Sequence, residues 1–258
     1  MADFIADFPV FLLVFVRMSA FFLTMPLFSY RNIPGQHKIA LAFYMALLVF
    51  FSIDKPVIEI GGMFYLLILK EAAAGLAIGL FAFIILGAIQ VAGGFIDFQM
   101  GFAIANVIDP QTGVQSPLVG QYLYTFALML LLALDGHHLL LDGAYYSFQI
   151  IPVEQPGLMF GSESLIYHVI TTFSMMFAAA FQMAIPVVGS LFLVDIALGI
   201  VARTVPQLNV FVVGLPLKIA VSFLVLLIVM PVFMMLIENL FEEMFYAMRG
   251  LMELLASG

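Results

Sequence analysis

The chain of 258 residues is too apolar for a water-soluble domain: 65% of its residues are hydrophobic, 9% are charged and the mean hydropathy is +1.20. Soluble domains are about half apolar and about one quarter charged, so much of this surface must face lipid or other subunits. The absence of cysteine excludes disulfides, thiol nucleophiles and cysteine-ligated metals. A net charge of −8, with only eight scattered Lys and Arg residues, excludes nucleic acid as a partner.

The apolar runs predict an all-α fold of about six hydrophobic helices, several of them broken or paired as hairpins. Turn sequences rich in Pro and Gly separate the runs, and no soluble domain interrupts them. The first run follows a segment without basic residues or a cleavage site, so we expect it to be retained as a helix. The runs are Phe8–Phe28, Ile39–Ile53, Ala72–Ile96, Pro110–Leu134, Gly136–Ile151, Leu165–Val194 and Ile219–Ile237.

Several runs contain residues that are unfavourable inside a bilayer. Arg17 lies within the first run, and Lys70 and Glu71 precede the third. A charge at mid-bilayer costs from about 2.5 kcal/mol upward, so these side chains are expected to point into protein or a watery path. Pro186 and Pro231 are expected to break up the last two runs.

Two small residues and one acid mark the third run. Gly75 and Gly79 lie on one helix face, where they permit close packing either within the chain or against another subunit. Asp97 follows the charge-free stretch and is open to three interpretations. It is a proton-binding carboxylate, a partner for Arg203 or Lys218, or an interfacial helix end.

The segment from Asn106 to Pro117 is rich in turn-forming residues, with Asp109, Pro110 and Gly113 between its ends. An Asp-Pro pair favours a turn, and Gly tolerates positive φ. We therefore expect a compact loop between two long apolar helices. It is either a surface connection or an element that occludes a pathway.

Adjacent histidines occur once, where His137 and His138 follow Asp135 and precede Asp142. Two His and nearby Asp residues suggest metal binding. Neighbouring positions lie about 100° apart on a helix, however, whereas the familiar two-His zinc helix uses positions i and i+4. Hydrogen bonding at a helix end is the favoured interpretation, and we predict no metal, cofactor or catalytic residue.

The most specific polar break lies within residues 195–218. Pro206 lacks a backbone donor and pushes the residue before it out of helical geometry, so the preceding helix should end there. Asn209 is expected to cap a new helix, which Gly214 and Pro216 would loosen again. The result is expected to be a polar break bracketed by two buried cations, Arg203 and Lys218.

Together with an ordered set of features upstream, this block resembles the FliR family of bacterial flagellar export proteins, in its flagellar branch more than its injectisome branch. The resemblance runs nearly from end to end and agrees in length. The residues that carry it are Arg17, Pro26, Lys38, Gln90, Gly93, Ile96, Asp97, Gly101, Asp109, Pro110, Gly113, Asp135, His137, His138, Asp195, Gly199, Arg203, Pro206, Gln207, Asn209, Phe211, Gly214, Pro216 and Lys218.

The resemblance implies a subunit of the type III export gate in the bacterial inner membrane and flagellar basal body. In this family the protein joins FliP and FliQ in a closed-ended helical pore for unfolded proteins, with FlhB as a further neighbour. A FliP-like half, 1–160, would continue into a FliQ-like half, 161–258, and a plug loop would lie at 106–121. The implied subunit-contact or structural motif is Gly93, Gly94, Asp97, Gly101, Arg203, Pro206, Gln207, Asn209, Phe211, Gly214, Pro216 and Lys218.

Two other classes of protein stay open. A proton-coupled secondary transporter of a small solute would titrate Asp97 against Arg203 or Lys218 and would act without partners. An intramembrane enzyme would use His137 and His138 as metal ligands. The sequence contains neither a Walker motif nor a nucleophile paired with a base, which favours a non-enzymatic pore subunit.

Overall fold

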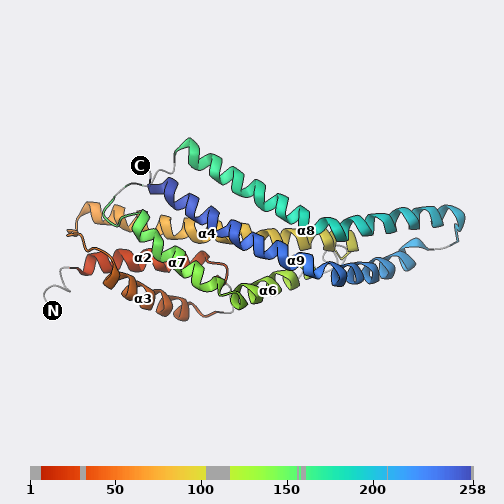
Figure 1. Cartoon of the computed structure of the whole chain (residues 1–258), viewed down its shortest axis with the longest axis horizontal. Coiled ribbons are helices and arrows are strands. Elements are labelled where there is room, and N and C mark those ends of the chain that lie inside the picture. Colours follow the sequence, from red (N-terminus) through yellow and green to blue (C-terminus); the bar gives the residue numbers. More distant parts are fainter. Residues whose placement is uncertain are drawn as a thin grey trace. The chain divides into compact units, whose positions relative to one another are not determined.

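Seven helices and no strand make up the described part of this computed structural model, which confirms the predicted all-α class (Figure 1). The structure describes residues 7–29, 33–102, 117–155, 157, 161–207 and 209–256. The helices are α2 (Phe8–Thr24), α3 (Gly35–Ser52), α4 (Gly62–Met100), α6 (Leu118–Ala133), α7 (Gly136–Ile150), α8 (Glu163–Thr204) and α9 (Val210–Ala256).

The chain divides into two compact units. The first consists of Met1–Ile85, Leu131–Phe173 and Glu242–Gly258, and the second of Leu86–Leu130 and Ser174–Phe241. The proposed division at residue 160 concerns resemblance to other chains rather than compactness, and it stays a prediction.

In the first unit, α2 lies beside α3 (Figure 1) and also packs tightly against α4. The ring of Phe11 meets Phe43 and Phe50 edge to face, at centroid distances of 5.5 and 5.7 Å. On the α4 side, a Cβ atom at Gly75 would lie 2.3 Å from the carbonyl oxygen of Arg17. A Cβ atom at Gly79 would lie 2.1 Å from the hydroxyl oxygen of Thr24, which is also in α2. This glycine pair therefore serves packing within the chain.

In the second unit, α4 ends in a glycine-dependent turn. Gly101 has φ +91°, a conformation that side chains with a Cβ atom rarely adopt. The N–H of Phe102 donates to the carbonyl of Asp97 at 3.0 Å, and that of Gly101 donates to Phe98 at 3.2 Å. This pattern is a Schellman motif, which satisfies carbonyls at the helix end and turns the chain away from the helix axis.

Four helices in the described part of the chain are long and apolar enough to cross a membrane. A fifth span results if α6 and α7, which are bent by 76° at their junction, count together. The most apolar window of α4 is 56% buried inside the chain, whereas those of α8 and α9 are only 22% and 11% buried. The most apolar windows of α8 and α9 therefore have little covering inside the chain.

The prediction that prolines break the last two runs is wrong. Pro186 lies inside α8, and Pro216 and Pro231 lie inside α9, which also continues through Gly214. A proline removes one helical hydrogen bond but leaves its neighbours in place, and apolar surroundings penalise any further opening of the backbone. One turn after Pro186, the hydroxyl of Ser190 donates to the carbonyl of Pro186 at 2.7 Å, a local contact that stays within the helix.

Candidate functional site

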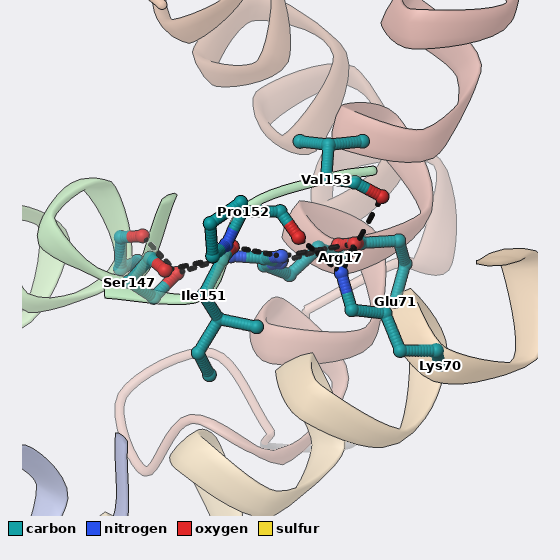
Figure 2. A network of polar contacts seen from close by, with 8 residues as sticks. Arg17, Lys70, Glu71, Ser147, Ile151, Pro152 and Val153 are labelled. Atoms are coloured by element: carbon teal, nitrogen blue, oxygen red, sulfur yellow. Dashed lines mark hydrogen bonds and ion pairs between the residues drawn. The ribbon is translucent and has the colours of Figure 1, made fainter. Parts of the chain in front are cut away.

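The first unit contains a fully buried cluster of charged groups (Figure 2). Arg17 from α2 and Lys70 and Glu71 from α4 have relative exposures of 1%, 5% and 0%. The prediction that these charges point into protein is confirmed. Their burial explains why charged residues interrupt the apolar runs: the charges are neutralised inside the unit, not placed in lipid.

All five N–H donors of Arg17 have an acceptor. Its Nε and one Nη2 donor bind both carboxylate oxygens of Glu71, which is a bidentate pair, and Nη2 also donates to the carbonyl of Ile151 at 2.9 Å. Nη1 donates to the carbonyl of Ser147 at 2.9 Å and to its hydroxyl at 3.2 Å. The guanidinium also lies 4.1 Å from the ring centroid of Phe148. Such a complete set of partners is the condition under which a buried charge is tolerated.

Lys70 completes the cluster by sharing one oxygen of Glu71, Oε1, with Nη2 of Arg17 (Figure 2). Its Nζ donates to Glu71 at 2.6 Å and to the carbonyl of Pro152 at 2.6 Å. Two cations and one anion leave one positive charge in excess, and that excess faces the carbonyl end of α7. The C-terminus of a helix carries a partial negative charge, so α7 supplies the missing compensation.

The local sequence explains why α7 presents its carbonyls here. Pro152 cannot continue a helix and forces the residue before it to be extended, so Ile151 has φ −112° and ψ 93°. The carbonyls of Ile151 and Pro152, just beyond the helix, accept from Arg17 and Lys70, and the Ser147 carbonyl accepts from Arg17 in addition to the N–H of Ile151. Sequence reasoning identified the charged residues but missed Ser147 and the α7 end, although a proline after an apolar helix was a usable signal.

A second polar centre lies in the second unit, where α4 meets α6. The carboxylate of Asp97 accepts the backbone N–H of Val119 at 3.3 and 3.1 Å, and Asp97 is 3% exposed. Val119 is the second residue of α6, so Asp97 caps this helix from a neighbouring helix. This contact matches none of the three interpretations of Asp97 fully, because the carboxylate is buried and caps another helix.

A glycine contact allows Asp97 to reach α6. A Cβ atom at Gly93 would lie 2.0 Å from the Cα atom of Gly120, so any side chain at position 93 would keep the backbones of α4 and α6 apart. Gly93 precedes Asp97 by one helical turn and lies on the same face of α4. Gly94 is looser, since a Cβ atom there would be 3.5 Å from the ring of Pro117.

A third polar contact joins α4, α8 and α9 within the second unit. Lys218 Nζ lies 2.5 Å from one carboxylate oxygen of Asp195, and the Gln99 amide donates to the other at 2.9 Å. Lys218 therefore pairs with Asp195 and not with Asp97. The prediction that both cations at the break are buried is wrong, because Arg203 is exposed, and it has no ion pair among the described residues. Sequence reasoning missed Gln99, because a glutamine in an apolar helix gives no hint of its distant partner.

The turn between α8 and α9 is mostly exposed. Helix α8 ends at Thr204, two residues before Pro206, and the side chain of Asn209 accepts the N–H groups of Phe211 and Val212 at 3.1 and 3.3 Å. Both predictions for this turn are confirmed. Pro206, Gln207 and Pro216 are exposed, and Phe211 is 85% exposed, whereas Gly214 is buried against Leu198.

The predicted plug loop falls largely outside the described residues. Asn106, Asp109, Pro110 and Gly113 lie in the part of the chain that the structure does not describe, and only Pro117 at its end is described. Pro117 is half-buried beside Gly94.

Apolar grooves run along the second unit. One is lined by side chains of α6 and α9, with Tyr122 and Leu227 among the exposed residues. Another lies between α4 and α8, where Phe95 meets Phe181 edge to face at 6.3 Å. The polar contacts of this unit join α4 to α6, α8 and α9, and the grooves offer apolar surfaces for packing.

Comparison with known proteins places these features in a family context. A family model described as bacterial export proteins, family 1, matches residues 8–244. The flagellar biosynthetic protein FliR of Bacillus subtilis (strain 168) is 58% identical over 248 residues, which is 96% of each chain. The FliR protein of Escherichia coli (strain K12) is 27% identical over 231 residues, 89% of this chain and 87% of its own. The Yop proteins translocation protein T of Yersinia pestis is 30% identical over 222 residues, 84% of each chain.

Proposed function

This chain belongs to the FliR family of bacterial export proteins, and we propose that it is a subunit of the flagellar type III export gate. The family consists of non-enzymatic membrane proteins of the flagellar export apparatus, with relatives in type III secretion. In the proposed role the chain forms, with FliP and FliQ, the gated pore through which unfolded flagellar proteins pass. FlhB is a further proposed neighbour, and the proposed location is the bacterial inner membrane within the flagellar basal body.

The observation that carries the proposal is the uncovered apolar surface of α8 and α9. Only 22% and 11% of their most apolar windows are buried inside the chain. A contiguous apolar surface of this extent marks a contact with lipid or with other subunits. Helical partners such as FliP and FliQ would cover it, and the exposed Phe211 and Arg203 at the α8–α9 turn offer an apolar anchor and an exposed cation at its end.

The two-part organisation of the chain is also part of the proposal. Residues 1–160 would form the FliP-like half and residues 161–258 the FliQ-like half. Helix α8 begins at Glu163, directly after this boundary, and the second half consists of the long helices α8 and α9 joined by a short turn. This pattern supports a helical hairpin that could occupy the place of a separate two-helix subunit.

Gating is assigned to the segment 106–121, acting as a plug in the lumen. The Schellman turn at Gly101 precedes this segment, and its C-terminal end is held in α6 by the contact of Asp97 with Val119. Fixed ends support a plug because a loop can seal a pore only if its base does not move with the substrate. In this mechanism no chemical step occurs in the chain, and the seal opens when substrate enters.

Deletion of residues 110–116 tests the plug. The variant complex is reconstituted with FliP and FliQ, and the leak of small ions through it is measured in proteoliposomes. A matched deletion of 57–60, in the exposed connection between α3 and α4, is the control. We expect a leak for the first deletion and none for the second. An intact seal after deletion of 110–116 would refute the plug, and failure of the full-length chain to co-purify with FliP and FliQ would refute the gate itself.

A further inference from the structure

Three side chains that can ligate metals meet at the bend between α6 and α7. Asp135, His137 and His138 each place one potential ligand atom within 4.8 Å of the others. The two imidazole rings have a centroid distance of 4.0 Å, and Nδ1 of His138 lies 3.6 Å from a carboxylate oxygen of Asp135. All three residues belong to the first unit, and the proposed export function makes no use of them.

The backbone at the bend explains this convergence. Asp135 has φ 56° and ψ 18°, and it is the one residue other than glycine with positive φ in the described part of the chain. The helix α7 begins only at Gly136. Asp135 therefore lies outside the helical spiral, and its carboxylate approaches the two histidines of the first turn from beyond the helix end. The 100° separation of neighbouring helical positions does not apply to this third ligand.

At this helix end the N–H of His138 donates to the carbonyl of Asp135 at 2.9 Å, but the side chains leave hydrogen-bonding capacity unused. The carboxylate of Asp135 makes no capping hydrogen bond to α7, although it occupies the N-cap position. Nδ1 of His137 is shielded from solvent and has no hydrogen-bond partner among the described residues. Buried polar atoms are nearly always paired, and an unpaired one points to a water or an ion at that place.

We propose that Asp135, His137 and His138 bind a transition-metal dication such as Zn²⁺, with water as the remaining ligand. Two imidazoles and one carboxylate suit Zn²⁺, Co²⁺, Ni²⁺ and Cu²⁺, whereas Mg²⁺ and Ca²⁺ require oxygen ligands. Bonds of about 2.0–2.2 Å bring tetrahedral ligand atoms to roughly 3.4 Å from one another. Asp135 and His138 are mostly exposed, so rotation of their side chains can close the site without moving either helix. The ion would hold the bend by joining its corner to the first turn of α7.

The test uses full-length protein without a polyhistidine tag, purified in detergent and treated with a chelator. Binding of Zn²⁺ is measured by calorimetry, and Co²⁺ is added in parallel because its visible spectrum reports nitrogen and oxygen ligands. The variants are H137Q, H138Q and D135N. Asn tolerates positive φ, so D135N removes the charge while the bend is kept. H37Q, at an exposed histidine of α3, is the matched control.

We expect one Zn²⁺ per chain in the wild-type protein and in H37Q, and no binding of Mg²⁺. Affinity should fall at least about tenfold in each of the three site variants. Zn²⁺ should also raise the melting temperature of the wild-type protein but not that of H138Q, while the metal-free proteins melt alike. The proposal is overturned if wild-type protein shows no saturable binding, if the three site variants bind as tightly as wild type, or if H37Q loses affinity to the same extent.

Discussion

Replacing Glu71 by Gln should destabilise the protein strongly, although the change is nearly isosteric. Glu71 is fully buried and accepts hydrogen bonds from both Arg17 and Lys70. In E71Q one carboxylate oxygen becomes an NH₂ group that faces a cationic donor, and the cluster is left with two cations and no anion. Removing one partner of a buried ion pair costs about 3–5 kcal/mol, because the remaining charge stays buried without compensation.

A loss of this size is measurable as a shift in melting temperature. For chains of 150–250 residues, 1 kcal/mol corresponds to about 2–4 °C, so the expected decrease is roughly 6–20 °C. The purified protein in detergent is heated for a fixed time, and the fraction that remains soluble and monodisperse is measured by size-exclusion chromatography. The matched control is E253Q, which removes the carboxylate of the exposed Arg249–Glu253 pair on α9.

The control makes the same Glu-to-Gln change in an ion pair that is exposed to solvent. Exposed pairs between neighbouring turns of a helix are solvated in either state, so E253Q should leave the melting temperature unchanged. If E71Q melts no lower than E253Q, the buried cluster does not hold the first unit together and the reasoning from its hydrogen bonds is wrong.

Two further predictions concern the second unit. G93A should prevent the close contact of α4 with α6 and lower the yield of folded protein. G87A, on the same helix at a position where a Cβ atom meets nothing within 4 Å, should fold at least as well as wild type. The yields of the two variants are compared by size-exclusion chromatography, and equal yields would contradict the contact. D97N should retain flagellar motility and thermal stability because Asn caps helices nearly as well as Asp, whereas D97A should lose about 0.5–2 kcal/mol of stability. Loss of motility in a stable D97N protein would instead favour a titrating carboxylate, as in the alternative of a proton-coupled transporter.

The sequence predicted the helical runs well, because apolar length alone is a strong signal, but it misjudged where they begin and end. The third run was predicted from Ala72, whereas α4 begins at Gly62 and includes Lys70 and Glu71. Lys70 and Glu71 were left out of the predicted span because they are charged, but a buried helix can contain charged residues whose hydrogen-bonding and ionic partners are also buried. The expected break at Pro186 failed for a related reason, since one missing backbone donor does not end a helix in apolar surroundings.

The candidate site was harder to predict, because its contacts join residues far apart in the chain. Arg17 and Glu71 are separated by 54 positions, and Gln99 and Asp195 by 96. Local patterns indicated that these residues needed partners but carried no information about which residues would supply them. The cap at Asn209 was predictable because both of its acceptor contacts lie within three residues of it.

The uncovered surface of α9 also bears on how this protein is made in the cell. In a chain synthesised ahead of its partners, the chain's own contacts bury only 11% of the most apolar window of α9, and the rest of that window stays uncovered. Such an orphan chain is a ready substrate for membrane proteases, since the exposed state persists until assembly. Its cellular abundance would then follow the supply of its partners instead of its own rate of synthesis, and balanced expression would become a requirement of the fold.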